Sequence, residues 1–368
     1  MILTIIIVLF SLVLLTALHE LGHFLLARKF GVRVEEFGIG YPPRIFGKKI
    51  GQTTYSLNLL PFGAFVRILG DEETDNSQES FSQKTLGQRA LILVGGVVSF
   101  WIIAVIIFTI IIGVGGIPTA VDDSFTQAGA NPFIQILQVV PKSPAELAGI
   151  KPGDKIGKLK VQSAKLKVEG QGIETNKVGE VQNFIASHKG EEIQMEVMRG
   201  DQEIDIAVTP RINPPMGEGA LGIAMARVVL TKTAWYKAPY KGVEITIQQT
   251  KNIPLTLVKA IKRKMQGEKS NDLQFVGPIG LGQIMGQALG QGWGNFLMLI
   301  AMISIWMALF NLLPIPALDG GRLLFLGIEL VRRKPVNPVI EKRITAVFFF
   351  IMIGFMALVS IKDIVKLF

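Results

Sequence analysis

The stretch Leu18-His19-Glu20-Leu21-Gly22-His23-Phe24 lies inside an apolar segment that runs from residue 1 to residue 27. Residues four apart on an α-helix lie one above the other, so His19 and His23 would direct both imidazoles towards the same point. Two neutral imidazoles at this spacing supply half of a zinc site. Because ionisable side chains are costly to bury in a lipid-embedded helix, their presence here indicates a functional metal site.

Glu20 indicates what chemistry this site would perform. It lies next to the first histidine, close enough to take a proton from water at the metal, and His-Glu-x-x-His is the pattern in which metalloproteases use such a glutamate as general base. A chance match on a packed helix is the alternative. Only three histidines occur in 368 residues, however, and two of them fall in this pattern.

The composition indicates a membrane protein with a soluble portion. Hydrophobic residues make up 49% of the sequence and charged residues only 18%, which is too apolar for a wholly soluble chain. The net charge of +9 does not indicate nucleic-acid binding, because the basic residues are mixed with acidic ones and largely flank apolar spans. Since the sequence has no cysteine, a zinc site would need histidine and carboxylate ligands.

Four segments are long and apolar enough to cross a bilayer, which takes about 20 helical residues. They are residues 1–27, 90–117, 293–322 and 344–366. Basic residues are frequent in 28–89 and in the short loop before the last span, which places both loops in the cytoplasm by the positive-inside rule. We therefore expect a polytopic α-helical membrane protein with four transmembrane helices, whose two termini and central soluble region are extracytoplasmic.

Residues 118–226 are expected to form this soluble region, because short β-prone runs alternate there with turn clusters. Residues 227–292 place aromatic and basic side chains around an apolar helical stripe, which suits amphipathic helices at the membrane surface. A linker helix that packs on the soluble domain is the alternative. Pro254 is expected to divide this stretch into two pieces.

Residues 28–89 contain two β-prone runs, 53–60 and 64–69, on either side of the turn signal Pro61-Phe62-Gly63. They predict a β-hairpin on the cytoplasmic side. Such a hairpin could lie beside the metal motif and offer a strand edge to an extended peptide. An ordinary surface hairpin is equally compatible with the composition.

A carboxylate must join His19 and His23 at membrane depth, because a catalytic zinc takes three protein ligands. Asp319 fits, since it ends the third apolar segment where two prolines and two glycines interrupt regular helix. Interrupted helix is tolerated at membrane depth around a site or a cavity. Glu329 is the second candidate. The alternative for Asp319 is a helix-end carboxylate that faces the cytoplasm beside Arg322.

Three features together resemble the site-2 protease family of intramembrane zinc metalloproteases, in particular the bacterial regulator-of-sigma-E protease type. They are His-Glu-x-x-His in the first span, Leu318-Asp319-Gly320 in the third, and residues 140–156, which are similar to the strand, helix and turn of bacterial PDZ domains. Residues 37–42 and 275–280 also look like family segments. One departure is Gly-Gly-Val-Val-Ser-Phe at 95–100, where many bacterial members have Gly-Pro-x-x-Asn-Phe.

The resemblance implies a role for each candidate residue. His19, His23 and Asp319 would bind Zn²⁺, and Glu20 would be the general base. The hairpin would be a membrane-reentrant β-loop that holds substrate extended, and Asn311 would contact the substrate backbone. A single inserted extracytoplasmic PDZ domain, with an α+β fold, would bind peptide ends.

The resemblance also implies cleavage of the transmembrane segments of single-span membrane proteins. This is regulated intramembrane proteolysis, of substrates such as anti-sigma factors or signal-peptide remnants, in the cell inner membrane with the metal site towards the cytoplasmic side. A PDZ-bearing membrane scaffold with a non-catalytic metal site is an alternative function. A metal-ion transporter is another, but it should carry further polar residues along its spans, and the second and fourth spans have few.

Overall fold

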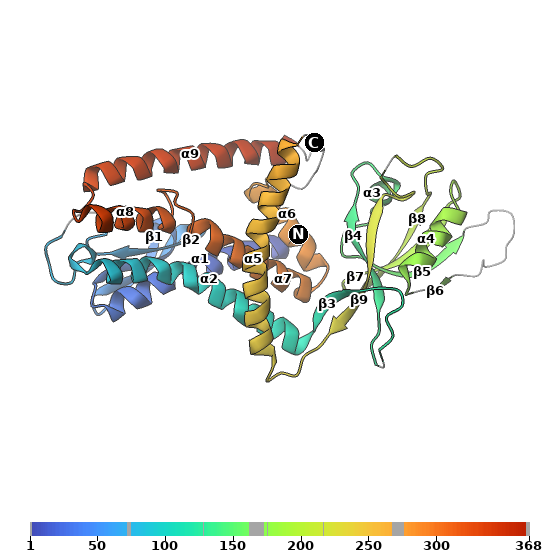
Figure 1. Ribbon diagram of the computed structural model, residues 1–368, viewed down its shortest axis with the longest axis horizontal. Helices are drawn as coiled ribbons and strands as arrows, with labels where there is room; N and C mark the ends of the chain where they lie inside the picture. The colour runs from blue at the N-terminus through green and yellow to red at the C-terminus, as the bar shows by residue number, and fades with distance from the viewer. Residues whose placement is uncertain are drawn as a thin grey trace. The chain divides into compact units, whose positions relative to one another are not determined.

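The computed structural model describes residues 2–71, 75–127, 129–161, 173–174, 176–215, 217–266 and 276–365. Contacts within the chain divide it into two compact units. The first unit consists of Met1–Thr109, Pro239–Gly286 and Leu297–Phe368, and the second of Ile110–Ala238 and Gln287–Phe296. Figure 1 labels the helices and strands of both.

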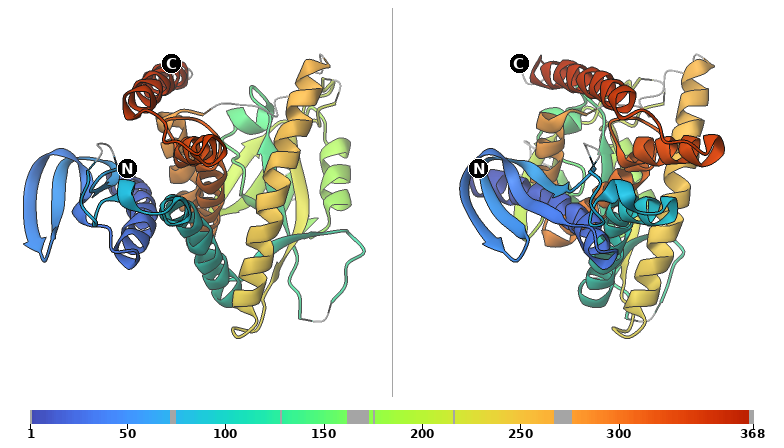
Figure 2. Two further views of the ribbon diagram at one scale, coloured as in Figure 1. Left: turned by 60° about the vertical axis from the view of Figure 1, so that its left-hand side comes forward. Right: turned by 90° about the vertical axis from the view of Figure 1, so that its left-hand side faces the viewer.

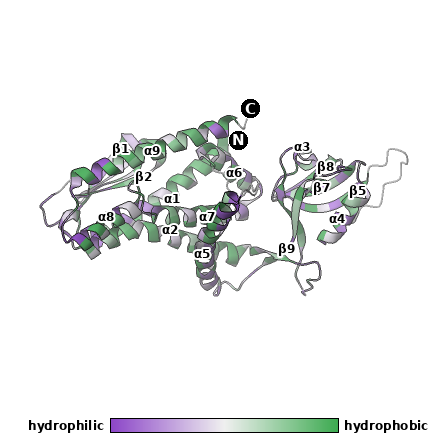
Figure 3. Ribbon diagram, turned by 45° about the horizontal axis from the view of Figure 1, so that its top comes forward, coloured by the Kyte–Doolittle hydropathy of each residue, from purple (hydrophilic) through white to green (hydrophobic). Residues whose placement is uncertain are grey.

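Four helices in the described part of the chain are long and apolar enough to cross a membrane. They are α1 (Ile2–Lys29), α2 (Leu86–Val114), α7 (Trp293–Asn311) and α9 (Pro338–Val365). Figure 3 shows that apolar residues predominate along α1, α2 and α9. The last helix begins at Pro338 and not at the expected 344, and residue 366 lies outside the described residues. The chain is thus a multi-pass membrane protein.

The third expected span, 293–322, is divided in the structure. Helix α7 ends at Asn311, and a separate helix, α8 (Asp319–Arg332), follows. Pro314 and Pro316 lie in the connecting segment, where the missing N–H and the ring of proline prevent a continuous helix. The connection folds tightly over the first turn of α8, because a Cβ at Gly321 would overlap Pro316 Cα and would lie 2.5 Å from the Ile315 carbonyl carbon. This turn fixes the position of Asp319.

Small residues let α1 and α2 approach each other closely, as is usual between membrane helices. A Cβ at Gly95 of α2 would lie 2.6 Å from Leu26 Cδ1 and 2.9 Å from the Gly22 carbonyl oxygen, both on α1. Helix α7 packs against α2 from another side, where Ser304 Oγ donates a hydrogen bond of 2.7 Å to the carbonyl oxygen of Phe100. The three helices form one packed group.

The expected region of surface helices, 227–292, has a different make-up in the structure. Its first residues belong to strand β9 (Ile223–Thr231), and helices α5 (Ala238–Met265) and α6 (Pro278–Gly290) follow. The expected break at Pro254 is wrong, because α5 runs through it. Residues 267–275, including the first residue of the family-like segment 275–280, lie outside the described residues.

The two β-prone runs are extended in the structure, and both pair with a strand that precedes them. Strands β1 (Val34–Ile50) and β2 (Thr53–Ile68) pair with each other, and the chain turns at Gly51, which has a φ of +63°. Both β-prone runs lie within β2. They run in opposite directions beside residues 36–39 of β1, so the chain also reverses at the expected turn, 61–63. The two strands lie beside α1 (Figure 2).

The register shows that this pair of strands folds back on itself. Phe37 of β1 is paired with Tyr55 and also with Val66, so the start of β1 lies between the two halves of β2. Glu36 is buried in this arrangement and accepts hydrogen bonds from Arg44 Nη2 at 2.7 Å and Ser56 Oγ at 2.6 Å. The second half of β2 is consequently an outer segment of the sheet.

The second unit is built on a seven-stranded sheet with the order β3-β9-β4-β5-β7-β8, in which β6 pairs with β5. Besides β9, its strands are β3 (Ile117–Val121), β4 (Phe133–Val139), β5 (Lys155–Val161), β6 (Ile173–Glu174), β7 (Ile193–Arg199) and β8 (Gln202–Val208). The sheet therefore extends to Thr231, beyond the expected boundary at 226. An inserted β-sheet domain thus accompanies the membrane helices.

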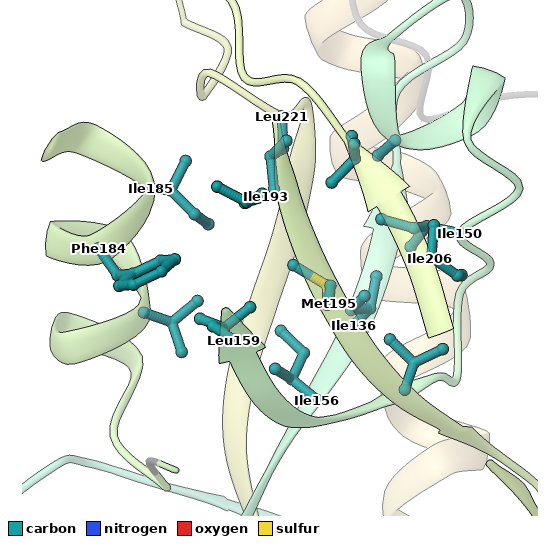
Figure 4. Close-up of a cluster of buried hydrophobic side chains, with 14 of the residues drawn as sticks. Ile136, Ile150, Ile156, Leu159, Phe184, Ile185, Ile193, Met195, Ile206 and Leu221 are labelled. Carbon is teal, nitrogen blue, oxygen red and sulfur yellow. The ribbon is translucent and has the colours of Figure 1, made fainter. Parts of the chain in front are cut away.

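Two short helices, α3 (Pro144–Leu147) and α4 (Val178–Ser187), complete the second unit. Figure 4 shows Phe184 and Ile185 of α4 directed at strand residues such as Leu159 and Met195. Leu159 and Met195 are fully buried. Asp123, which follows β3, accepts hydrogen bonds from the backbone N–H groups at the start of α4. The unit thus has its own apolar core.

Candidate metal centre

Helices α1 and α8 bring three side chains to one point. His19 and His23 are buried on α1, and Asp319 is the first residue of α8. Asp319 Oδ2 lies 3.4 Å from His19 Nε2 and 3.5 Å from His23 Nε2, and the two Nε2 atoms lie 3.3 Å apart. The three residues form a group that can hold a metal ion.

These separations fit a four-coordinate zinc site. Zinc binds histidine nitrogen and carboxylate oxygen at about 2.0–2.1 Å in a tetrahedral arrangement, which places neighbouring ligand atoms about 3.3–3.4 Å apart. The observed separations of 3.3, 3.4 and 3.5 Å agree with this geometry. Three protein ligands leave the fourth position of the tetrahedron open, as is typical of catalytic zinc sites.

Two side chains of the group, His23 and Asp319, have lone pairs free to bind a metal ion. His23 Nδ1 lies 2.9 Å from the carbonyl oxygen of Ile92. A carbonyl can only accept, so Nδ1 carries the proton and Nε2 of the neutral ring presents a lone pair. Asp319 Oδ2 is buried without a hydrogen-bond partner among the described residues. A buried carboxylate oxygen without a donor is costly, and a bound cation would satisfy it.

Helix α2 supports the two imidazoles from the side. The ring of His19 stacks on Phe100, with centroids 4.5 Å apart and an angle of 15° between the planes. Gly96 of α2 lies directly beside the rings, because a Cβ there would overlap His23 Nε2 and would lie 2.6 Å from His19 Cε1. Only a residue without a side chain leaves space for the ligands at this position.

Glu20 links the metal group to the hairpin. Its side chain is partly buried on α1, and its Oε2 accepts a hydrogen bond of 3.1 Å from the backbone N–H of Val66 in β2. Val66 belongs to the outer segment of the sheet, so its N–H is directed at α1. A carboxylate that neighbours the metal group along the helix thus touches the edge of a strand.

The other candidate residues lie elsewhere. Asn311 is the last residue of α7, and its Nδ2 donates a hydrogen bond of 3.0 Å to the Met307 carbonyl oxygen. Among the described residues, it makes no hydrogen bond with the three-residue group. Glu329, the second carboxylate candidate, accepts a hydrogen bond of 2.6 Å from Arg89 Nη2. The third histidine, His188, lies in the second unit against Phe184.

Three features of the site were not expected from the sequence. They are Gly96 beside the rings, the N–H of Val66 at Glu20, and the carbonyl of Ile92 at His23. A pair of glycines in an apolar span signals a close helix contact, so Gly96 could have been suspected. The two backbone contacts have no sequence signal, because any residue type supplies an N–H and a carbonyl.

Comparisons with known proteins identify the family of this chain. The family model for Peptidase family M50 matches residues 6–355. A presumed zinc metalloprotease of Clostridium perfringens is 33% identical over 97% of this chain and 98% of its own length. The zinc metalloprotease RasP of Geobacillus kaustophilus is 28% identical over 95% of each chain. This chain therefore belongs to peptidase family M50, the site-2 protease family, and is a membrane zinc metalloprotease.

Proposed function

We propose that this protease cleaves the transmembrane segments of single-span membrane proteins in regulated intramembrane proteolysis. The observation that carries the proposal is the convergence of two imidazoles and one carboxylate oxygen, 3.3–3.5 Å apart, on helices that include a membrane-length span. A reaction centre on a membrane-spanning helix suits a substrate that is itself embedded in the bilayer. Anti-sigma factors and signal-peptide remnants are substrates of this kind.

His19, His23 and Asp319 hold the zinc ion in this proposal. When bound, Zn²⁺ lowers the pKa of water and polarises a carbonyl oxygen. Glu20 accepts the proton of the attacking water and then delivers it to the nitrogen of the leaving amine as the C–N bond breaks. His23 is held in the required tautomer by Ile92, and Phe100 fixes the ring plane of His19. The residues of α1 and α2 thus prepare the site before substrate arrives.

The outer segment of β2 receives the substrate as an added strand. A helical substrate hides its carbonyl groups in hydrogen bonds, so it must unwind before it is cleaved, and pairing with a strand edge replaces the bonds that are lost. The Val66 N–H donates a hydrogen bond to the Glu20 carboxylate. A peptide paired beside this position would therefore have its backbone next to the proposed general base. Asn311 assists by contacting the substrate backbone.

The second unit acts as an extracytoplasmic PDZ domain that filters substrates. Its strands and helices enclose a separate apolar core. Strand β9 follows the glycine-containing loop 219–222, where a peptide end could bind by strand addition. The loops 28–89 and 333–337 face the cytoplasm, and the termini and the second unit face outwards. Substrates whose outer part has already been shortened pass the filter.

The proposal is tested with the purified full-length protein in bilayer vesicles. The substrate is a synthetic peptide with one transmembrane segment, and its products are identified by mass spectrometry. We expect cleavage by the wild-type protein, and a loss of at least about 100-fold in rate with E20Q or after zinc chelation. Cleavage by E20Q at the wild-type rate would contradict the assignment of Glu20.

The filter is tested with the same intact protein and two substrates. They share one transmembrane segment and differ only in the length of the extracytoplasmic part, which is short in one and a folded domain in the other. We expect the short substrate to be cleaved at least about tenfold faster. Equal rates would rule out selection by the second unit.

A further inference from the structure

Two ion pairs hold helix α8 in place. Arg322 Nη1 donates a hydrogen bond of 2.7 Å to Asp71 Oδ2, and Arg89 Nη2 donates one of 2.6 Å to Glu329 Oε1. The first pair joins α8 to the segment that follows β2, and the second joins α8 to α2. Both pairs therefore position the helix that carries Asp319, but only the first connects this helix to the hairpin.

The Asp71–Arg322 pair closes a ring of polar contacts around the metal centre. Helix α1 meets α8 through the histidines and Asp319, and it meets β2 through Glu20 and the Val66 N–H. The Asp71–Arg322 contact supplies the third side of the ring, from α8 back to the end of β2. Each of the three elements is thereby fixed to the other two.

The positions of both partners allow this pair to control the strand. Arg322 lies one helical turn after Asp319, so it moves together with the metal ligand. Asp71 comes shortly after β2, which ends at Ile68. The strand end is held from its other side as well, because the Leu69 N–H donates a hydrogen bond of 3.0 Å to the Arg33 carbonyl oxygen.

The position of β2 along its own axis determines which substrate bond reaches the reaction centre. A strand advances about 3.3 Å per residue, and a slip of one residue turns every side chain to the opposite face. A misplacement of about 1 Å at a reaction centre can already cost about 100-fold in rate. An edge that receives substrate must therefore be fixed relative to the metal ligands.

We infer, on the basis of the proposed function, that Arg322 is a positioning residue that holds the substrate-receiving edge of β2 in register with the metal centre. It acts through Asp71 and does not touch the reacting atoms. The two ion pairs provide a matched comparison, because Arg89 makes the same type of contact with the same helix, and its ion pair does not involve the hairpin.

The variants follow from this comparison. R322A removes the ion pair with Asp71. R322K keeps the positive charge but lacks the planar guanidinium group with its several N–H donors. R89A breaks the control pair. The double variant D71R/R322D reverses the ion pair, and the cavity of about 330 Å³ that both residues line gives the exchanged side chains space. D71N alone is a weaker test, because Glu341 lines the same cavity and could pair with Arg322.

The first readout is amide hydrogen exchange in the zinc-free full-length protein, followed on peptides that cover residues 64–71. We expect R322A to exchange at least about tenfold faster than wild type there, R322K to lie between them, and D71R/R322D to return towards wild type. R89A should leave exchange in this segment unchanged. This readout needs no proteolytic activity, so it tests Arg322 even if the proposed reaction fails in the cleavage assay.

The second readout is the position of the cleaved bond in the transmembrane peptide. We expect R322A to cleave neighbouring bonds in addition to the wild-type bond, and R89A to keep the wild-type bond. Zinc content should stay at the wild-type level in both. Unchanged exchange at residues 64–71 in R322A, or an equal effect of R89A, would overturn the inference. Zinc loss with unchanged exchange would also overturn it, because Arg322 would then support only Asp319.

Discussion

The backbone N–H of Val66 donates a hydrogen bond of 3.1 Å to the Glu20 carboxylate, although the two residues are 46 positions apart in the sequence. This contact joins the strand that we propose to receive substrate to the proposed general base. It predicts that a substrate strand added at this edge lies directly beside the carboxylate. The geometry of the hairpin and the chemistry of α1 are thus parts of one site.

Removing this N–H should impair catalysis without disturbing zinc binding. Proline at position 66 has no N–H to donate, and proline is tolerated in edge strands where the N–H faces away from the partner strand. We expect V66P to lower kcat/KM by about 10- to 100-fold in the peptide assay. V66A keeps the N–H and should retain most of the activity. Equal losses in both variants would show that the side chain, and not the N–H, matters.

Asp319 and Glu329 can be distinguished by zinc content. Only Asp319 lies within 3.5 Å of both imidazoles, whereas Glu329 is paired with Arg89. We expect D319A to lower zinc affinity by at least about 100-fold, because a three-ligand site loses one ligand. E329A should keep about one zinc per chain, as measured by inductively coupled plasma mass spectrometry. Zinc loss in E329A with retention in D319A would reverse the assignment.

Any side chain at position 96 should weaken zinc binding. A Cβ there would overlap His23 Nε2, so G96A must displace a ligand or separate α1 from α2. The control is G113A in the same helix, where the new Cβ would meet Ala238 Cβ at an ordinary 3.7 Å. Alanine also has the better helix propensity, by about 1 kcal/mol. We expect G113A to retain zinc and G96A to lose it.

Asp123 should stabilise the second unit in a pH-dependent way. Hydrogen bonds from the N–H groups of Gly179 and Val178 hold the pKa of Asp123 below its ordinary value. A lowered pKa in the folded state means that this stabilisation is complete above the ordinary pKa of about 4 and is lost as the pH falls through the folded value. Capping interactions of this type contribute about 1 kcal/mol.

D123A is therefore expected to lower the unfolding free energy of the second unit by about 1 kcal/mol at pH 7. The difference from wild type should shrink as the pH falls below about 4. Denaturant unfolding of the full-length protein is monitored by hydrogen exchange on peptides of the α4 region. It gives the difference in unfolding free energy at pH 7 and its change with pH. A constant difference at every pH would contradict the role of the carboxylate.

Much of the account could be predicted from the sequence, because it rests on local patterns. Helical spacing places His19 and His23 together, and the prolines after α7 interrupt the third span before Asp319. The expected family and the zinc dependence are confirmed by the comparisons. The roles of the individual site residues, and of Asn311 in particular, stay predictions.

The rest depends on long-range contacts that leave no local signal. The turn signal Pro61-Phe62-Gly63 predicts the reversal between the two halves of β2, but no local signal predicts that both halves pair with residues 36–39 of β1. The Arg322–Asp71 pair joins residues 251 positions apart. Asp363 likewise accepts hydrogen bonds from the N–H groups of Gly277 and Gly280, far from it in the sequence.

The most direct test of the central claim is the rate at which zinc-loaded wild type and E20Q cleave the same membrane-embedded peptide, with zinc content measured in each sample. The account predicts about one zinc per chain in both proteins, cleavage within the transmembrane segment by wild type, and a rate at least about 100-fold lower for E20Q. Zinc-loaded wild-type protein that leaves every such peptide intact, or E20Q that cleaves at the wild-type rate, would contradict it.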